Sequence, residues 1–241
     1  MKLESKLPGS KTSIFSVMSK MAHEYDAINL SQGFPNFETD RKLKELVTKA
    51  MRDGHNQYPP DAGVLELREM ISQKFNDLYG RYYKPETEIT ITSGATEALY
   101  NSITAFVQKD EEVIVLKPAY DSYEPTIQLA GGIPVQIQLK GSDYKVDWEE
   151  VASAITNRTR MIIINTPHNP TGTVLSKEDM LKLQKLLKDT NIILLSDEVY
   201  QHLIFDGRLH QSASRFPELS KRSIVCGSFG KTFHNTGWKT G

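Results

Sequence analysis

A lysine at position 231 stands in a segment of small and hydroxyl-bearing residues, SFGKTFHNTGWKTG, at positions 228–241. Most lysines in proteins lie on solvated surfaces, and glycine, serine and threonine around a lysine suit a bound ligand better than such a surface. A lysine that attacks a carbonyl group needs its amine neutral and held in place. The segment therefore makes Lys231 a candidate nucleophile.

An aspartate follows an apolar run in the stretch IILLSDEVY at positions 192–200. A carboxylate in this position is partly buried, and a buried charge needs a cationic or proton-bearing partner. Asp197 is therefore a candidate acid for a ligand site. The simpler alternatives for Asp197 are a helix N-cap and a surface acid.

Two further motifs could bind a ligand. SGATEAL at 93–99 places glycine and small residues where a strand turns into a helix, and free N–H groups at a helix start bind phosphate. The Thr96 hydroxyl would add to such a site, although the motif could equally be a capped helix start. NTPHNPTG at 165–172 is either a rigid loop or a device that directs Asn169 to the sheet edge, for which a cis Asn169–Pro170 bond is plausible. The chain has no GxGxxG motif and no P-loop.

Apolar runs that alternate with helical patterns indicate an α/β fold with a mostly parallel sheet between helices. In such sheets ligands lie outside the carboxyl ends of the strands. Strands are predicted at 88–94, 112–118, 134–139, 160–167, 191–200 and 223–232, and helices at 95–108, 122–132, 146–155 and 176–190. The helix at 176–190 begins with a capping box formed by Ser176 and Asp179.

The first ninety residues have a different pattern and predict an N-terminal arm and a small lobe. Gly/Pro loops at 30–37 and 56–63 alternate with amphipathic helices at 40–54 and 64–80. We assign residues 1–45 to the arm and a small-domain segment, and residues 46–241 to the large domain.

Composition excludes several classes of protein. A formal net charge of −1 implies no electrostatic attraction to nucleic acid or to an anionic membrane. One cysteine, Cys226, excludes an intrachain disulfide framework and fits a reducing cytoplasm, and the start lacks an apolar core of signal-peptide length. The six histidines show no metal-ligand spacing, so we expect no metal site.

Taken in order, GATEAL, a tyrosine after a proline-terminated strand, NTPHNPTG, SDEVY and SFGKT followed by GWK resemble the fold-type I pyridoxal-phosphate aminotransferases. The loops LSQGFPNF and NQYPPDAG resemble the methionine and kynurenine (glutamine transaminase K-like) branch. The resemblance runs from about residue 14 to residue 241. It implies an aspartate aminotransferase-like large domain with pyridoxal 5′-phosphate as cofactor.

The resemblance also implies a role for each matching residue. Lys231 would hold the cofactor as a Schiff base, Asp197 would pair with the pyridine nitrogen, and Tyr200 is the third catalytic residue. The other cofactor-binding residues would be Gly94, Ala95, Thr96, Tyr120, Asn169, Ser228, Lys239 and Tyr58. Lys239 stands where many relatives have arginine. Gly33, Phe34 and Asn169 would contact the substrate.

The activity implied is transfer of an amino group from a methionine-like or aromatic amino acid to a 2-oxo acid by a ping-pong aldimine/ketimine mechanism. We expect a homodimer in which Tyr58 reaches the site of the other subunit. The resemblance further predicts that the sequence stops before the C-terminal segment with the carboxylate-binding arginine. Alternatives are a C–S lyase on the same fold and a chain that binds the cofactor without catalysis.

Overall fold

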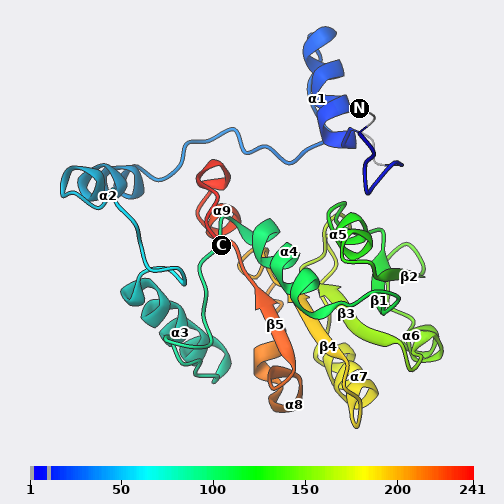
Figure 1. Ribbon diagram of the computed structural model, residues 1–241. Helices are drawn as coiled ribbons and strands as arrows, with labels where there is room; N and C mark the ends of the chain where they lie inside the picture. The colour runs from blue at the N-terminus through cyan, green and yellow to red at the C-terminus, as the bar shows by residue number, and fades with distance from the viewer. Residues whose placement is uncertain (1–2, 10–11) are drawn as a thin grey trace.

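A parallel β-sheet forms the centre of the computed structural model, which describes residues 3–9 and 12–241 (Figure 1). Its strand order is β2-β1-β3-β4-β5, and every neighbouring pair is parallel. The strands are β1 (Glu112–Lys117), β2 (Ile133–Gln138), β3 (Thr159–Asn165), β4 (Ile193–Asp197) and β5 (Ser223–Cys226). The predicted α/β class with a mostly parallel sheet is therefore confirmed.

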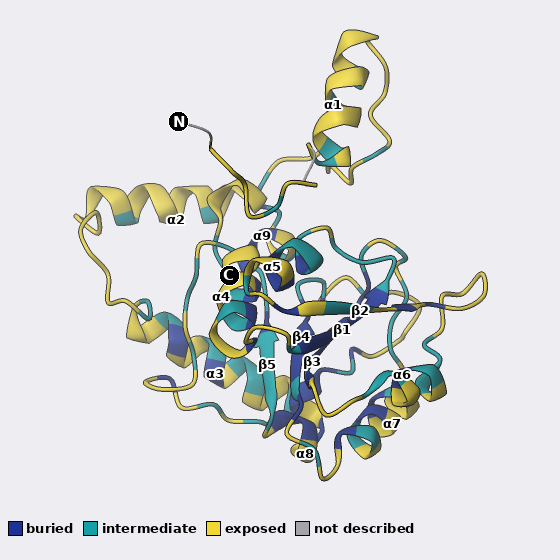
Figure 2. Ribbon diagram, turned by 45° about the vertical axis from the view of Figure 1, so that its right-hand side comes forward, coloured by how far each residue is buried: buried dark blue, intermediate teal, exposed yellow. Residues whose placement is uncertain are grey.

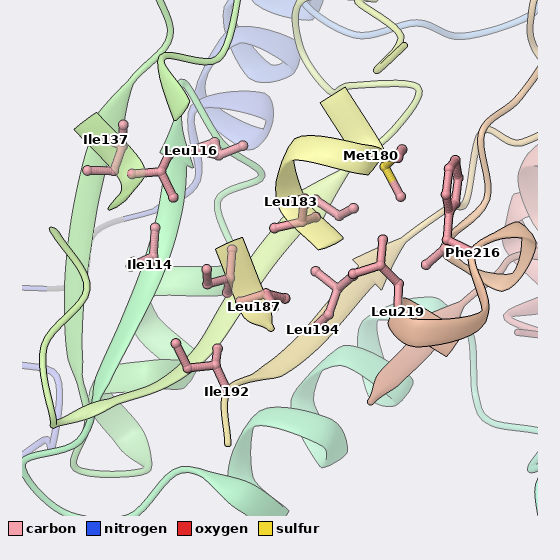
Figure 3. Close-up of a cluster of buried hydrophobic side chains, with 14 of the residues drawn as sticks. Ile114, Leu116, Ile137, Met180, Leu183, Leu187, Ile192, Leu194, Phe216 and Leu219 are labelled. Carbon is pink, nitrogen blue, oxygen red and sulfur yellow. The ribbon is translucent and has the colours of Figure 1, made fainter. Parts of the chain in front are cut away.

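Helices cover both faces of this sheet because side chains alternate along each strand. Ile162 and Leu194 face the layer with α6 (Trp148–Ala154), α7 (Lys177–Leu187) and α8 (Pro217–Ser220). Ile163 and Leu195 face the layer with α4 (Ala95–Phe106) and α5 (Tyr123–Leu129). Figure 3 shows part of the first cluster, with Leu187 of α7 beside the strands.

The start of α7 confirms the predicted capping box. The Asp179 N–H donates to Ser176 Oγ over 3.1 Å, and the Ser176 N–H donates to Asp179 Oδ2 over 2.9 Å. Trp148 of α6 donates its indole N–H to Asp179 Oδ1 over 2.8 Å. One carboxylate thus caps α7 and joins it to α6.

Leu194→Ala is expected to lower the free energy of unfolding by about 2–5 kcal/mol. Leu194 is fully buried in β4, so the truncation leaves a cavity below the carboxyl end of the sheet. Leu181→Ala is the matched control, since Leu181 is 45% exposed on α7. Chemical denaturation measures both changes, and an equal loss for the two variants would contradict this description of the core.

The N-terminal helices lie largely apart from the sheet. Figures 1 and 2 show α1 (Ile14–Glu24) and α2 (Arg41–Arg52) away from the strands and mostly exposed, and neither helix has a buried residue. α1 was not among the helices predicted from the sequence. The division at residues 45 and 46 stays a prediction, and this position lies inside α2. α3 (Leu65–Tyr79) follows, with Arg68 and Ser72 buried.

The strand predicted at 88–94 is wrong. The segment lacks a β neighbour along its length within the described residues, and only Thr92 exchanges two backbone hydrogen bonds with Gly241, at 2.9 and 3.1 Å. A cleft of about 780 Å³ is lined by Ile91 and Thr92 on one side and by β5 on the other. A β-strand forms only where its backbone pairs continuously with a neighbouring strand. The cleft lies beside residues 88–94 where such a neighbour would have to pair, so this segment is extended without being a strand.

The strand predicted at 223–232 is also too long. β5 ends at Cys226, and Phe229–Thr232 form the short helix α9. Ser228 Oγ accepts from the Lys231 N–H over 3.4 Å, and the Thr232 hydroxyl donates to the Ser228 carbonyl over 3.1 Å. The hydroxyls that marked this segment as a ligand site also cap a helical turn, so Lys231 lies on a helix. The 3₁₀ turns η1 (Ala213–Arg215) and η2 (Thr236–Trp238) complete the elements.

No helix within residues 3–9 and 12–241 combines the length and the apolar character that crossing a membrane would require.

Candidate active site

The strand order places the candidate residues at one edge of the sheet. β1 is followed by β2 on one side and β3 on the other, so the connections diverge between β1 and β3, where ligands bind in open α/β sheets. The carboxyl end of β4 supplies Asp197, and the segments that follow β1, β3 and β5 supply Tyr120, Asn169 and Lys231. Parallel strands end at the same edge, which brings residues distant in sequence together.

Asp197 is the last residue of β4 and is only 3% exposed. Its Oδ2 accepts from the Tyr123 hydroxyl over 2.5 Å, and its Oδ1 accepts from the Val199 N–H over 3.3 Å. Burial raises the pKa of Asp197 from 3.8 to about 6, partly opposed by these two hydrogen bonds. Within the described part of the chain no lysine, arginine or histidine forms an ion pair with this carboxylate. The site therefore offers a buried acid that a cationic ligand would stabilise.

The raised pKa predicts how the stability of the ligand-free protein depends on pH. Between pH 3.8 and about 6, unfolding releases a proton that folded Asp197 retains, so stability falls as pH rises through this window. The loss is about 3 kcal/mol and levels off above the folded pKa. Denaturation of the native protein and of the Asp197→Asn variant at several pH values in this range measures the loss of stability. The variant lacks the titrating carboxyl and should not show this loss. Parallel stability curves would contradict the buried ionisable acid.

The start of α4 provides a site for an anion. Gly94 precedes the helix with φ of 79° and no side-chain cap, and none of residues 3–9 and 12–241 accepts a hydrogen bond from the Ala95 or Thr96 N–H. A Cβ on Gly241 would lie 2.5 Å from the Ala95 nitrogen, so the end of the chain packs tightly here. The neighbouring Lys239 backbone adopts φ of 54°. Free amides, the helix dipole and a nearby lysine together favour a phosphate.

Lys231 lies close to the ring of Tyr200. Its Nζ is 5.6 Å from the ring centroid, and the lysine is exposed. Burial raises the pKa of the half-buried Tyr200, and the negative charge of Asp197 raises it further. An accessible amine beside a protonated phenol can reach a ligand that also contacts Asp197.

Tyr120 lies between the start of α4 and the residues around Asp197. Its ring meets that of Tyr123 edge-on with centroids 5.7 Å apart, and its hydroxyl lies 3.3 Å from Thr96 Oγ1. Tyr120 therefore stands between the α4 start and the phenol that contacts Asp197. An aromatic side chain here can pack against a planar ligand.

Asn169 is held by the chain around β3. Its N–H donates to Asn165 Oδ1 over 2.6 Å, and Asn165 Nδ2 donates to the Asp197 carbonyl over 2.9 Å. The Asn169–Pro170 bond is cis, as expected. Asn165 thus joins the ends of β3 and β4 and fixes the backbone that carries Asn169.

A family model described as aminotransferase class I and II matches residues 25–241. The chain belongs to the class I and II aminotransferases.

Individual relatives of this aminotransferase chain are longer than the chain itself. The methionine aminotransferase of Escherichia coli is 47% identical over 99% of this chain and 62% of its own length. Kynurenine–oxoglutarate transaminase 1 of Rattus norvegicus is 35% identical over 98% of this chain and 59% of its own length. A solved Escherichia coli structure with a methionine aminotransferase function has a TM-score of 0.95 at 45% identity, covering all of this chain and 62% of the other. The chain therefore spans about three-fifths of these relatives, and its fold is aspartate aminotransferase-like.

Three predicted residues of the aminotransferase chain lie outside this cluster. Tyr58 is 98% exposed and Phe34 is 86% exposed, and Gly33 is exposed on the same loop as Phe34. The end of that loop contacts the 228–241 segment, because the centroid of the Phe37 ring lies 4.6 Å from that of the His234 ring. Their predicted roles stay predictions. The described residues also contain no His/Cys/Asp/Glu group that could hold a metal ion.

Tyr123 and Asn165 were missing from the predicted site residues. Both contact the end of β4 that carries Asp197. Asn165 could have been predicted as a site residue, since it is the polar residue that ends an apolar strand. Tyr123 lies in a helical pattern, and no neighbouring residue in the sequence indicates that it belongs to the site. Only the packing of α5 on the sheet brings its hydroxyl to Asp197.

Proposed function

We propose that this chain binds pyridoxal 5′-phosphate and acts in the transfer of an amino group from a methionine-like or aromatic amino acid to a 2-oxo acid. The observation that carries this proposal is the buried Asp197, which lacks a cationic partner among the described residues. A protonated pyridine nitrogen would supply that partner. The family membership of the chain supports the same reaction.

The residues fit each polar group of the cofactor. A phosphate suits the free amides of α4, the Ser228 hydroxyl and the Lys239 amine. Asn169 and Tyr200 can donate hydrogen bonds to the phenolic oxygen, and Tyr120 can pack on the ring. Lys231 would be the covalent attachment point for the aldehyde carbon. Gly94, Ala95 and Thr96 form the turn that approaches the phosphate.

When bound, pyridoxal phosphate supplies an electron sink for the electron pair left at the substrate Cα. Asp197 keeps a proton on the ring nitrogen through its negative charge. Lys231 Nζ would accept the proton from the substrate Cα as a general base and would then serve as the acid that returns a proton to the reacting molecule. Tyr200 and Asn169 orient the reacting groups by hydrogen bonding, which reduces the motion needed to reach the transition state.

The preference for methionine-like or aromatic substrates rests on the relatives and on the N-terminal loops. Relatives include methionine aminotransferase and kynurenine–oxoglutarate transaminase 1. The exposed rings of Phe34 and Phe37 would line an apolar side-chain pocket, and the Gly33 backbone would meet the substrate carboxylate. We further propose a cytoplasmic homodimer in which the exposed Tyr58 contributes to the other subunit's phosphate site. The chain would divide into an arm at 1–45 and a cofactor-binding domain at 46–241.

A donor and acceptor assay tests this function. Protein incubated with pyridoxal phosphate and methionine should release the matching 2-oxo acid, and a second 2-oxo acid should become aminated. Chromatography of both products measures the transfer. A thiol, ammonia and a 2-oxo acid formed together in the absence of an acceptor would instead reveal a C–S lyase. Cofactor binding without any product would show a chain that binds but does not catalyse.

A further inference from the structure

Tyr123 makes the shortest hydrogen bond to the buried acid of the site. Its hydroxyl donates to Asp197 Oδ2 over 2.5 Å, and its side chain is only 2% exposed. Burial raises the pKa of Tyr123 well above 10, and the negative charge of Asp197 raises it further, so the phenol remains a donor at all physiological pH values. The contact crosses from α5 to the carboxyl end of β4.

None of the other titratable groups described near Asp197 stabilises its ionised form. Glu198 follows it in the chain and its charge raises the pKa of Asp197. Cys226 on β5 and Tyr200 lie near enough for the charge of Asp197 to raise their own pKa values, and both therefore stay neutral. Among the described residues Tyr123 is the one side chain that donates a hydrogen bond to this carboxylate.

We propose that Tyr123 is a positioning residue that keeps the Asp197 carboxylate ionised and fixed in orientation for the ring nitrogen of the cofactor. The inference rests on the function proposed above. An acid with a pKa of about 6 is mostly ionised at pH 7, so its carboxylate can pair with a cation near neutrality. Without the phenol, burial would leave a larger fraction protonated and unable to pair with a protonated ring.

Two hydrogen bonds fix the orientation of the Asp197 carboxylate. Tyr123 holds Oδ2 and the Val199 N–H holds Oδ1, so the carboxylate plane cannot rotate freely. Tyr123 begins α5, and Tyr120 lies three residues before it. One short segment therefore supplies both the ring that packs on the cofactor and the donor that orients its acid.

Tyr123→Phe tests the inference because phenylalanine keeps the buried ring and removes only the hydroxyl. In ligand-free protein the pKa of Asp197, followed by carboxyl ¹³C NMR, should rise by about one unit. The dissociation constant for pyridoxal phosphate should increase by about tenfold. The pH midpoint of the visible band of the loaded protein should also shift. Tyr83→Phe is the matched control, since its hydroxyl lies 2.9 Å from Ser214 Oγ, away from Asp197, and it should change none of these values.

A double-mutant cycle separates positioning from a loss of packing. In an Asp197→Asn background, Tyr123→Phe should weaken cofactor binding by less than twofold, because the charge that the phenol supports is absent. Equal weakening in both backgrounds, or an unchanged pKa of Asp197, would overturn the inference. Failure of native protein to bind pyridoxal phosphate would overturn the proposed function instead, and the pKa comparison would then show whether the phenol still controls the acid.

Discussion

Lys231→Ala is expected to lower the rate of amino transfer by at least about 10³-fold. In the proposed function Lys231 is both the covalent attachment point and the base that moves the substrate Cα proton, and the substitution removes both. Lys231 Nζ lies 5.6 Å from the Tyr200 ring centroid, and no other lysine is described in contact with that ring. Steady-state kinetics with methionine and a 2-oxo acid measure the loss.

Lys221→Ala is the control for Lys231→Ala. Lys221 is exposed and pairs with Glu218 at 2.6 Å beside the start of β5, the end of the strand remote from the site. Its replacement should leave the rate within about twofold and the stability within about 0.5 kcal/mol. Full turnover by the Lys231→Ala protein would mean that another amine performs the reaction.

Asp197→Asn is expected to lower turnover by about 10²–10⁴-fold and to weaken cofactor binding. Asparagine has nearly the same shape but no charge, so it cannot keep a proton on the ring nitrogen. Without ligand the same variant should be more stable than native protein above pH 6, because burial penalises the charged carboxylate. Lower activity together with higher stability distinguishes this acid from an ordinary structural residue.

Asp143→Asn provides the comparison for the Asp197 variant. Asp143 lies on an exposed turn and pairs with Lys145 at 2.7 Å. Its replacement should alter neither turnover nor cofactor binding. If Asp197→Asn retained native kcat and native affinity for pyridoxal phosphate, the buried acid would have no part in the reaction.

Much of the sheet and several site residues follow from local sequence. Continuous apolar runs such as RMIIIN at 160–165 and ILLSD at 193–197 form buried parallel strands. Polar residues at or soon after the ends of such runs lie at the shared carboxyl edge, where Asn165 links the Asn169 N–H to the Asp197 carbonyl. The capping box of α7 is also local, since both partners lie within one helical turn.

Other features depend on partners that local sequence does not specify. The 88–94 segment has strand-like composition, but a strand exists only where a neighbour pairs along its length. From the sequence alone, Ser228 could either follow a strand or cap a helical turn. In the structure it accepts a hydrogen bond from the Lys231 N–H and caps α9. The contact between Tyr123 and Asp197 joins residues 74 positions apart, so it appears only once α5 packs on the sheet.

Borohydride reduction with peptide mapping tests most directly whether this chain holds pyridoxal phosphate through Lys231. Protein incubated with the cofactor and reduced should gain the mass of one phosphopyridoxyl group, located on Lys231 within the segment 228–241. Lys231→Ala should abolish this label, and Asp197→Asn should lower the cofactor affinity without moving the label to another lysine. A stable label on a different lysine, or no label at saturating cofactor, would contradict the account.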